Sequence, residues 1–254
     1  MYSQTTLVVE QLKKRFGGVV ALDGVDLRVL DKSVTMIIGP NGSGKTTLIN
    51  VISGLYKPDG GRIFFNGLNI TGWPPYKVYS AGVVRTFQVP AVFAKLTVLE
   101  NLLIAARSHP GEKLTVAPFK LKWSKYEEEL VEKAFHIMQL LNIDHLWNQP
   151  ASSLSGGQMK LLEIGRALMS SPKVVLMDEP IAGINPALAH MIFNHILELR
   201  KQLGLTFLIV EHRLDIALKY VDYVYAMASG KVICKGEPKD VVNDPAVIRS
   251  YLGE

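Results

Sequence analysis

Short β-branched and aromatic runs, separated by glycine turns, occupy the first part of the chain. Leu7–Glu10 and Val25–Val29 flank a Gly17-Gly18 turn, and Arg62–Phe65 leads into Asn66-Gly67. Asn-Gly between two such runs is a strong hairpin signal, because both residues tolerate the positive φ of a two-residue turn. The pattern therefore predicts an antiparallel β lobe at the start of the chain.

Three later runs are apolar at nearly every position: Val34–Ile38, Val174–Met177 and Leu205–Val210. Strands buried on both faces of a parallel sheet have this continuous pattern, whereas half-exposed strands alternate. Near the end, Val224–Ile233 with a turn at Ser229-Gly230 predicts a hairpin. The later part of the chain is therefore expected to build an α/β core.

Between Thr97 and Leu168 the apolar positions recur with the period of a helix. One clear stripe comprises Leu130, Val131, Ala134, Ile137, Met138 and Leu141. Because strand-like runs lie on both sides, we predict a helical lobe inserted at about residues 97–168. Residues 1–254 then form a single domain of the α/β class, with an antiparallel β lobe and an inserted α-helical lobe.

Composition narrows the picture only a little. The chain has 254 residues, of which 48% are hydrophobic and 20% charged, and its net charge is +5; this is ordinary globular composition. Cys234 is the single cysteine, so no disulfide forms within the chain. We expect no signal peptide, and no apolar run approaches the roughly 20 residues that span a bilayer. A membrane role would therefore act through partners.

A glycine-rich string follows the first buried strand and fits the phosphate-binding P-loop pattern G-x-x-x-x-G-K-[ST]. It consists of Gly39, Pro40, Asn41, Gly42, Ser43, Gly44, Lys45, Thr46 and Thr47. Its glycines let successive backbone N–H groups turn toward phosphate oxygens, and the following helix offers its N-terminus. We expect Lys45 to reach the β- and γ-phosphates of ATP and Thr46 to offer a hydroxyl to Mg²⁺.

Two carboxylates end the second buried strand. Asp178 and Glu179 follow Val174–Met177 directly. An aspartate at this place suits Mg²⁺, and the next glutamate could act as the general base toward water. An apolar run ending in Asp-Glu is weak by itself, since it also suits the start of a helix. The P-loop upstream favours the catalytic interpretation.

A third motif is Leu154, Ser155, Gly156, Gly157 and Gln158. Ser155 and Gln158 form a capping box, which alone predicts only a helix start. Two glycines at that start are poor helix formers and make sense where backbone must approach a ligand. This pentapeptide resembles the signature motif of the ABC ATPases, and the P-loop and the Asp-Glu strand extend the resemblance over essentially the whole chain.

The resemblance implies a P-loop NTPase core that binds and hydrolyses ATP with Mg²⁺. It implies a head-to-tail dimer in which Ser155 and Gly157 of one subunit face the γ-phosphate held by the other. Gln88, within Thr86-Phe87-Gln88, is similar to the glutamine that contacts Mg²⁺ and the attacking water. His212, after the third buried strand, is similar to the histidine that contacts the γ-phosphate.

Two positions are less settled. Phe16 resembles the aromatic residue that stacks on adenine, where tyrosine is commoner; the alternative is a core residue of the hairpin. Asn185 stands where many ABC ATPases have aspartate. Asn keeps an acceptor oxygen but has no charge, which puts a charged role of this loop in doubt.

Several softer cues are similar to the ATPases of branched-chain amino acid importers. They are Phe16–Asp23, Arg85–Gln88, Ala182–Pro186 and the ending Tyr251–Glu254. This resemblance implies a peripheral subunit on the cytoplasmic face of the membrane. Its partners would be ATP and ADP, integral-membrane permease subunits, a second ATPase that is identical or different, and indirectly an external solute-binding protein.

Two other functions stay open at this stage. An importer for urea or amides would use the same ATPase chemistry, because the permease and the binding protein select the solute. A soluble ABC ATPase acting on nucleic acid or ribosomes usually has a coiled-coil insertion or two ATPase halves, and this sequence has neither. We therefore expect no nucleic acid among the partners.

Overall fold

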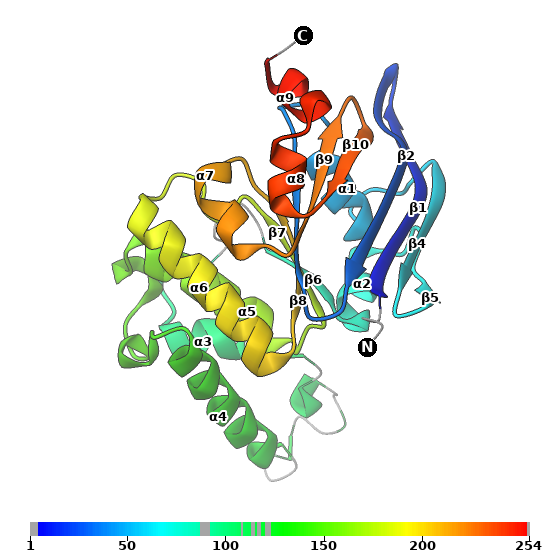
Figure 1. Ribbon diagram of the computed structural model, residues 1–254. Helices are drawn as coiled ribbons and strands as arrows, with labels where there is room; N and C mark the ends of the chain where they lie inside the picture. Colours follow the sequence, from blue (N-terminus) through cyan, green and yellow to red (C-terminus); the bar gives the residue numbers. More distant parts are fainter. Residues whose placement is uncertain are drawn as a thin grey trace. The chain divides into compact units, whose positions relative to one another are not determined.

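The computed structural model describes residues 5–86, 92–107, 109–112, 115, 118–119 and 123–252. These residues form two compact units (Figure 1). The first unit combines residues 1–88 with 173–254, and the second comprises residues 89–172. In the described part of the chain, no helix is long and apolar enough to cross a bilayer.

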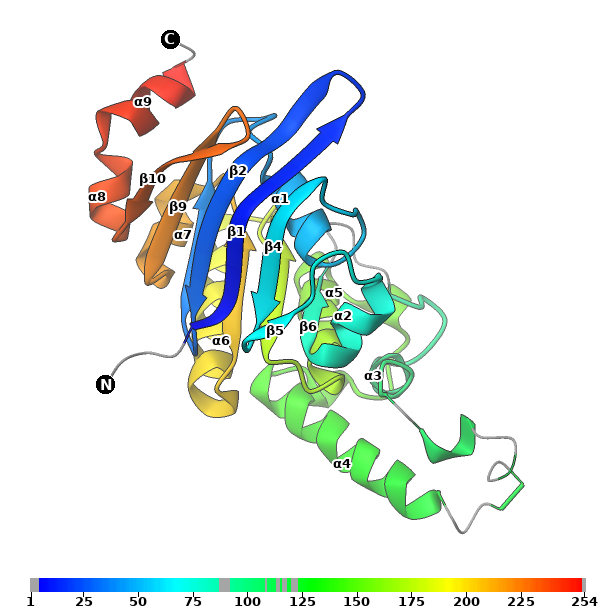
Figure 2. The ribbon, with the colours of Figure 1, turned by 90° about the vertical axis from the view of Figure 1, so that its right-hand side faces the viewer.

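The antiparallel lobe predicted at the start is a sheet of four strands in the order β2-β1-β4-β5. Its strands are β1 (Thr5–Phe16), β2 (Val19–Leu30), β4 (Gly60–Phe65) and β5 (Leu68–Asn69). Asn66 and Gly67 form the predicted tight turn, both with positive φ. Figure 2 shows β1, β2 and β4 side by side.

The second sheet of this unit contains all three continuously apolar runs. Its order is β10-β9-β3-β8-β7-β6, and every neighbouring pair except β10-β9 is parallel. The strands are β3 (Val34–Ile38), β6 (Val83–Arg85), β7 (Val174–Asp178), β8 (Thr206–Val210), β9 (Tyr223–Ala228) and β10 (Lys231–Gly236). Every residue of β3, β7 and β8 is buried, as the sequence pattern predicted.

Strand order decides which chain segments meet at the carboxyl edge of this sheet. Because β3, β8 and β7 are adjacent and parallel, their last residues lie at one edge. The segments that follow these strands begin at Gly39, Glu211 and Glu179. In open α/β sheets this edge is where ligands bind.

Helices cover both faces of the parallel sheet. Helix α1 (Lys45–Ile52) and the antiparallel sheet share one apolar core, in which Leu12, Leu27, Leu48 and Ile49 are fully or almost fully buried. Helix α6 (Pro186–Leu203) lies on the other face (Figures 1 and 2). The other α-helices in the described part of this unit are α2 (Pro75–Ala81), α7 (Leu214–Ala217), α8 (Pro238–Val242) and α9 (Pro245–Leu252), and a 3₁₀ turn follows α7 at Leu218–Tyr220.

The second unit is helical, as the period of its apolar residues predicted. It contains α3 (Val98–Leu103), α4 (Ser124–Leu140) and α5 (Gly156–Met169), which contact one another. Of the predicted stripe, Leu130, Ala134, Ile137, Met138 and Leu141 are buried and belong to the core, whereas Val131 is only half-buried. Two short 3₁₀ turns, Asp144–Leu146 and Ala151–Ser153, lead from α4 to α5.

Candidate functional site

The glycine-rich string leaves β3 in a conformation that only glycine adopts without strain. Gly39 has φ +149° and Gly44 has φ +101°. A Cβ on Gly39 would lie 2.1 Å from the Met227 carbonyl oxygen, and one on Gly44 would lie 2.4 Å from that of Ala21. The loop is thus pressed against two neighbouring segments, and its next residue begins α1. This is the strand–loop–helix context that the P-loop requires.

Lys45 is the cation of this loop and is only 5% exposed. Its Nζ donates to the carbonyl oxygens of Gly39 at 2.8 Å and Pro40 at 2.9 Å, and to Ser43 Oγ at 3.3 Å. Burial lowers the pKa of Lys45, and the negative charges of Glu179 and Asp178 oppose that shift. The ammonium group is therefore folded back over the loop, next to the N-terminus of α1, where anions bind favourably.

Asp178 ends β7 as a buried carboxylate. Arg85 Nη2 lies 3.1 Å from its Oδ2, and Arg85 Nη1 also donates to Asn50 Oδ1. Burial raises the pKa of Asp178, while the adjacent Arg85 charge lowers it. Sequence reasoning did not single out Arg85 for this role, because the contact follows from the pairing of β6 with β7.

Mg²⁺ fits the chemistry of these groups. It is usually held by one or two carboxylates, waters and substrate phosphates, and not by a complete protein cage. Asp178 provides one such carboxylate at the strand end, and Thr46 provides an exposed hydroxyl at the start of α1.

Glu179 and His212 form a pair. His212 Nε2 lies 3.0 Å from Glu179 Oε1, and both side chains are partly exposed, 33% and 25% respectively. Glu179 has φ +51°, an uncommon conformation for a glutamate, and its N–H donates to the Val210 carbonyl at 2.8 Å. The turn after β7 therefore places a carboxylate beside an imidazole at the edge of the sheet.

The comparisons with known proteins agree with this geometry. The ABC transporter family profile matches residues 22–182, and the profile described as "Branched-chain amino acid ATP-binding cassette transporter" matches residues 231–254. The chain belongs to the ABC transporter ATPases.

Relatives cover the whole chain. The probable branched-chain amino acid transport ATP-binding protein LivG of Methanocaldococcus jannaschii is 54% identical, covering 98% of this ATPase and 97% of that protein. The high-affinity branched-chain amino acid transport ATP-binding protein BraF of Pseudomonas aeruginosa is 38% identical, with 99% of both chains covered. A crystal structure of an ABC transporter cassette in its ADP conformation has a TM-score of 0.87 at 53% identity, covering 99% of this chain and 100% of that one.

Phe16 lies at the tip of the antiparallel sheet of the ATPase and is 43% exposed. It is therefore not a core residue of the hairpin, which was the alternative interpretation. The rings of Phe16 and Tyr56 form a T-shaped pair with centroids 5.2 Å apart, and Lys14 Nζ lies 5.3 Å from the Phe16 centroid. The exposed ring offers a surface on which a planar base can stack.

The signature motif belongs to the helical unit and begins α5. Ser155 Oγ accepts from the Gln158 N–H at 3.3 Å, and Gln158 Oε1 accepts from the Ser155 N–H at 2.9 Å, which confirms the capping box. Gly156 and Gly157 form the first turn, and a Cβ on Gly156 would meet nothing within 4 Å. The helix N-terminus therefore has open space beside it.

Two further sequence predictions have different outcomes. Gln88 lies outside the described residues. Asn185 is the N-cap of α6: its Oδ1 accepts from the Leu188 N–H at 2.9 Å. An uncharged acceptor satisfies this N–H as an aspartate would, so Asn185 has a structural role that needs no charge.

Tyr251 contacts the P-loop from the last helix of the chain. Its hydroxyl accepts a hydrogen bond from the Gly39 N–H at 2.8 Å. The sequence pattern does not indicate this contact, because Gly39 and Tyr251 lie 212 positions apart and no local periodicity relates α9 to the loop.

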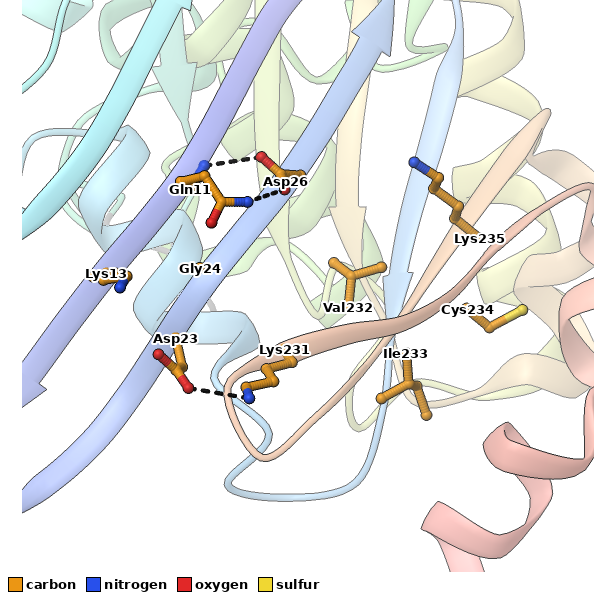
Figure 3. Close-up of a pocket in the computed structure, with 10 residues that line it drawn as sticks. All are labelled: Gln11, Lys13, Asp23, Gly24, Asp26, Lys231, Val232, Ile233, Cys234 and Lys235. Atoms are coloured by element: carbon orange, nitrogen blue, oxygen red, sulfur yellow. Dashed lines mark hydrogen bonds and ion pairs between the residues drawn. The ribbon is translucent and has the colours of Figure 1, made fainter.

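A separate hollow of about 450 Å³ lies between the antiparallel sheet and β10 (Figure 3). Lys231 of β10 pairs with Asp23 of β2 across the hollow at 3.2 Å, and Gln11 of β1 pairs with Asp26 of the neighbouring strand β2 on one wall of it. The Gly230 N–H beside it donates to the Ser43 carbonyl at 3.1 Å, and the Gly230 carbonyl accepts from the Asp23 N–H at 2.9 Å. Through Gly230 the P-loop is thus connected to β2, the strand that begins three residues after Phe16.

Proposed function

We propose that this ABC ATPase powers the import of branched-chain amino acids through separate membrane-spanning permease subunits. The single observation that supports hydrolysis most directly is the Glu179–His212 pair beside Asp178 and the P-loop lysine. Support for the solute class comes from the relatives whose names describe branched-chain amino acid transport and from the match of residues 231–254.

In the proposed mechanism the P-loop N–H groups and Lys45 hold the phosphates of ATP, and Phe16 stacks on the adenine. Thr46, Asp178 and Gln88 would hold Mg²⁺, which would neutralise phosphate charge. Glu179 accepts a proton from water while the water oxygen forms a bond to the γ-phosphorus. The bond from the γ-phosphorus to the oxygen that bridges to the β-phosphate breaks, and ADP leaves. His212 orients Glu179 and donates toward the γ-phosphate.

The dimer is part of the same proposal. In it, the α5 N-terminus of one subunit, with Ser155, Gly156, Gly157 and Gln158, faces the γ-phosphate held by its partner. The open space beside Gly156 and the helix dipole both suit a phosphate. Closure on ATP and reopening after hydrolysis would transmit the free energy of ATP to the permeases.

An apolar hollow on the first unit supports a permease contact. It has a volume of about 220 Å³ and is lined by Ser53, Leu55, Pro75, Tyr79, Val83 and Arg85. Leu55 is 53% exposed and Tyr76, next to the hollow in sequence, is 73% exposed. The sequence offers a second apolar segment for such a contact after Gln88, which comprises Val89, Pro90, Val92 and Phe93; Val89 and Pro90 lie outside the described residues. We propose that a permease helix docks here.

The catalytic proposal is tested with Glu179→Gln. We expect ATP to bind with unchanged Kd and kcat to fall by roughly 100- to 10,000-fold, the contribution of a general base. Hydrolysis at the parent rate would overturn the assignment of Glu179.

The transport proposal needs the native complex. The ATPase is purified in gentle detergent from its membranes, its partners are identified by mass spectrometry, and the complex is placed in liposomes. ATP-driven uptake of labelled leucine, absent with Glu179→Gln, would support it; recovery of only soluble or ribosomal partners would overturn it.

The docking surface has a matched control. Leu55→Arg should lose the permease subunits in the same purification while keeping basal ATPase activity, whereas Leu68→Arg, at a site 52% exposed on β5, should keep both. Equal recovery of permeases with the two variants would exclude Leu55 from the contact.

A further inference from the structure

Glu211 is a buried carboxylate immediately before His212. It follows β8 and is only 1% exposed. Carboxylates are rarely buried without a partner, because a buried charge loses the stabilisation that water gives it. The ionisable groups nearest in sequence, His212 and Arg213, have partly exposed side chains at the same turn. The burial of Glu211 therefore needs a specific reason.

The partners of Glu211 are backbone N–H groups from two different loops. Its Oε1 accepts from the Ile181 N–H at 2.9 Å, and its Oε2 accepts from the His212 N–H at 3.0 Å and, more weakly, the Arg213 N–H at 3.4 Å. Ile181 is two residues after Glu179. One carboxylate thus joins the segment that follows the proposed base to the segment that contains its histidine partner.

A second contact joins the same two segments. Arg213 Nη1 donates to the Ile184 carbonyl at 2.9 Å. We call residues 180–185, between Glu179 and α6, the post-base loop. Ile181 near its start and Ile184 near its end are both held by the residues on either side of His212 in sequence. Between them, the Ala182 N–H donates to the Glu179 carbonyl at 3.1 Å.

Only a carboxylate can make the Glu211 bridge. Each of its oxygens accepts, and it has no donor to oppose the N–H groups on either side. A glutamine of the same shape would turn an NH₂ group toward one of the two loops, leaving at least one buried N–H without an acceptor. A threonine has one oxygen and a shorter reach. Of these side chains, only a carboxylate can therefore accept hydrogen bonds from both loops at once.

We propose that Glu211 is a positioning residue for hydrolysis, which sets the separation of Glu179 and His212 by fixing both of their loops to one carboxylate. This inference rests on the proposed roles of Glu179 and His212 and adds the group that holds them in place. Arg213 supports the same arrangement through the post-base loop. Neither residue touches the nucleotide in this scheme, so their loss should affect the chemical step and not ATP binding.

The first test compares Glu211→Gln with the parent ATPase for kcat, KM for MgATP and thermal unfolding. We expect kcat to fall by roughly 10- to 100-fold, the cost of displacing a reacting group by about 1 Å, with KM within about two-fold. Glu163→Gln in α5 is the control: it also removes a buried carboxylate, 7% exposed and 2.9 Å from Lys160, but should leave kcat near the parent value.

A double-mutant cycle separates positioning from general support of the fold. If Glu211 acts through the histidine, Glu211→Gln should cost several-fold less in a His212→Ala background than in the parent. Equal losses in both backgrounds, or a parent-like kcat in Glu211→Gln, would overturn the proposal. If Glu211→Gln does not fold, Arg213→Met tests the second contact at a partly exposed side chain. We expect kcat to fall by roughly 3- to 10-fold and KM to stay unchanged. An unchanged kcat would overturn the proposal.

Glu179→Gln, measured in parallel, distinguishes a failure of the positioning role of Glu211 from a failure of the proposed base Glu179. If it is inactive and Glu211→Gln is fully active, the positioning inference fails and the proposed catalytic base stands. If Glu179→Gln is active, the proposed base itself fails.

Discussion

Replacing Arg85 by methionine is predicted to destabilise the ATPase strongly, because it leaves a buried charge without its partner. Arg85 and Asp178 are 3.1 Å apart, and their side chains are only 12% and 7% exposed. Removing one member of a buried pair typically costs about 3–5 kcal/mol, most of it from the stranded charge. Arg85 also donates to Asn50, so the change removes a contact with α1 as well.

The destabilisation should depend on pH in a defined direction. Burial already raises the folded pKa of Asp178 above 3.8, and loss of Arg85 raises it further. A raised folded pKa means that protonation favours the folded state, so this stabilisation is lost as pH rises through that pKa. Arg85→Met should therefore cost most near pH 8 and less near pH 5, which is closer to the pKa at which protonation of Asp178 removes the stranded charge.

The assay is urea unfolding of the nucleotide-free protein, followed by circular dichroism at both pH values. Arg62→Met, at an exposed arginine of β4, is the control and should change stability by no more than about 0.5 kcal/mol. A loss below about 1 kcal/mol near pH 8, the range of surface pairs, would refute the idea that Asp178 depends on Arg85. Equal losses at both pH values would refute the link to Asp178 ionisation.

Three other changes have defined outcomes. Gly44→Ala should abolish ATP binding measured by calorimetry, since it forces an alanine into φ +101° with its Cβ 2.4 Å from the Ala21 carbonyl; normal binding would show that the loop can relax. Phe16→Ala should weaken binding of a fluorescent ATP analogue by about 1–3 kcal/mol, the worth of one base stack, and Phe16→Tyr should restore it. Tyr251→Phe should speed hydrogen exchange at the Gly39 amide, because it removes the hydroxyl that accepts from this N–H. It should weaken ATP binding by about 1 kcal/mol at most, the net contribution of one hydrogen bond. Unchanged exchange would show that the Gly39 amide does not depend on the hydroxyl.

Features whose requirements are met within a few residues could be predicted from sequence. The Asn66-Gly67 turn, the Ser155–Gln158 capping box and the glycine-rich string each need particular backbone conformations that only certain residues adopt. The nearly continuous apolar runs that form β3, β7 and β8 indicated strands buried on both faces, because half-exposed strands would alternate with polar residues.

Asn185 shows where a local comparison misleads. By sequence it stood out as a missing charge, whereas in the structure its amide oxygen caps α6. The cap needs an acceptor and not a net charge, so the substitution preserves the local structure.

The sequence by itself determined the glycine-rich loop, the strands buried on both faces and the carboxylate that ends β7, because backbone conformation and burial pattern are local properties. Tertiary structure alone decided that Arg85 pairs with Asp178, that Glu211 joins two loops and that Tyr251 meets Gly39, residues 93, 30 and 212 positions apart. The physical reason is that a side chain acquires its partner from strand order and loop packing. The sequence around a single arginine, glutamate or tyrosine has no periodic pattern from which the strand order or the loop packing could be predicted.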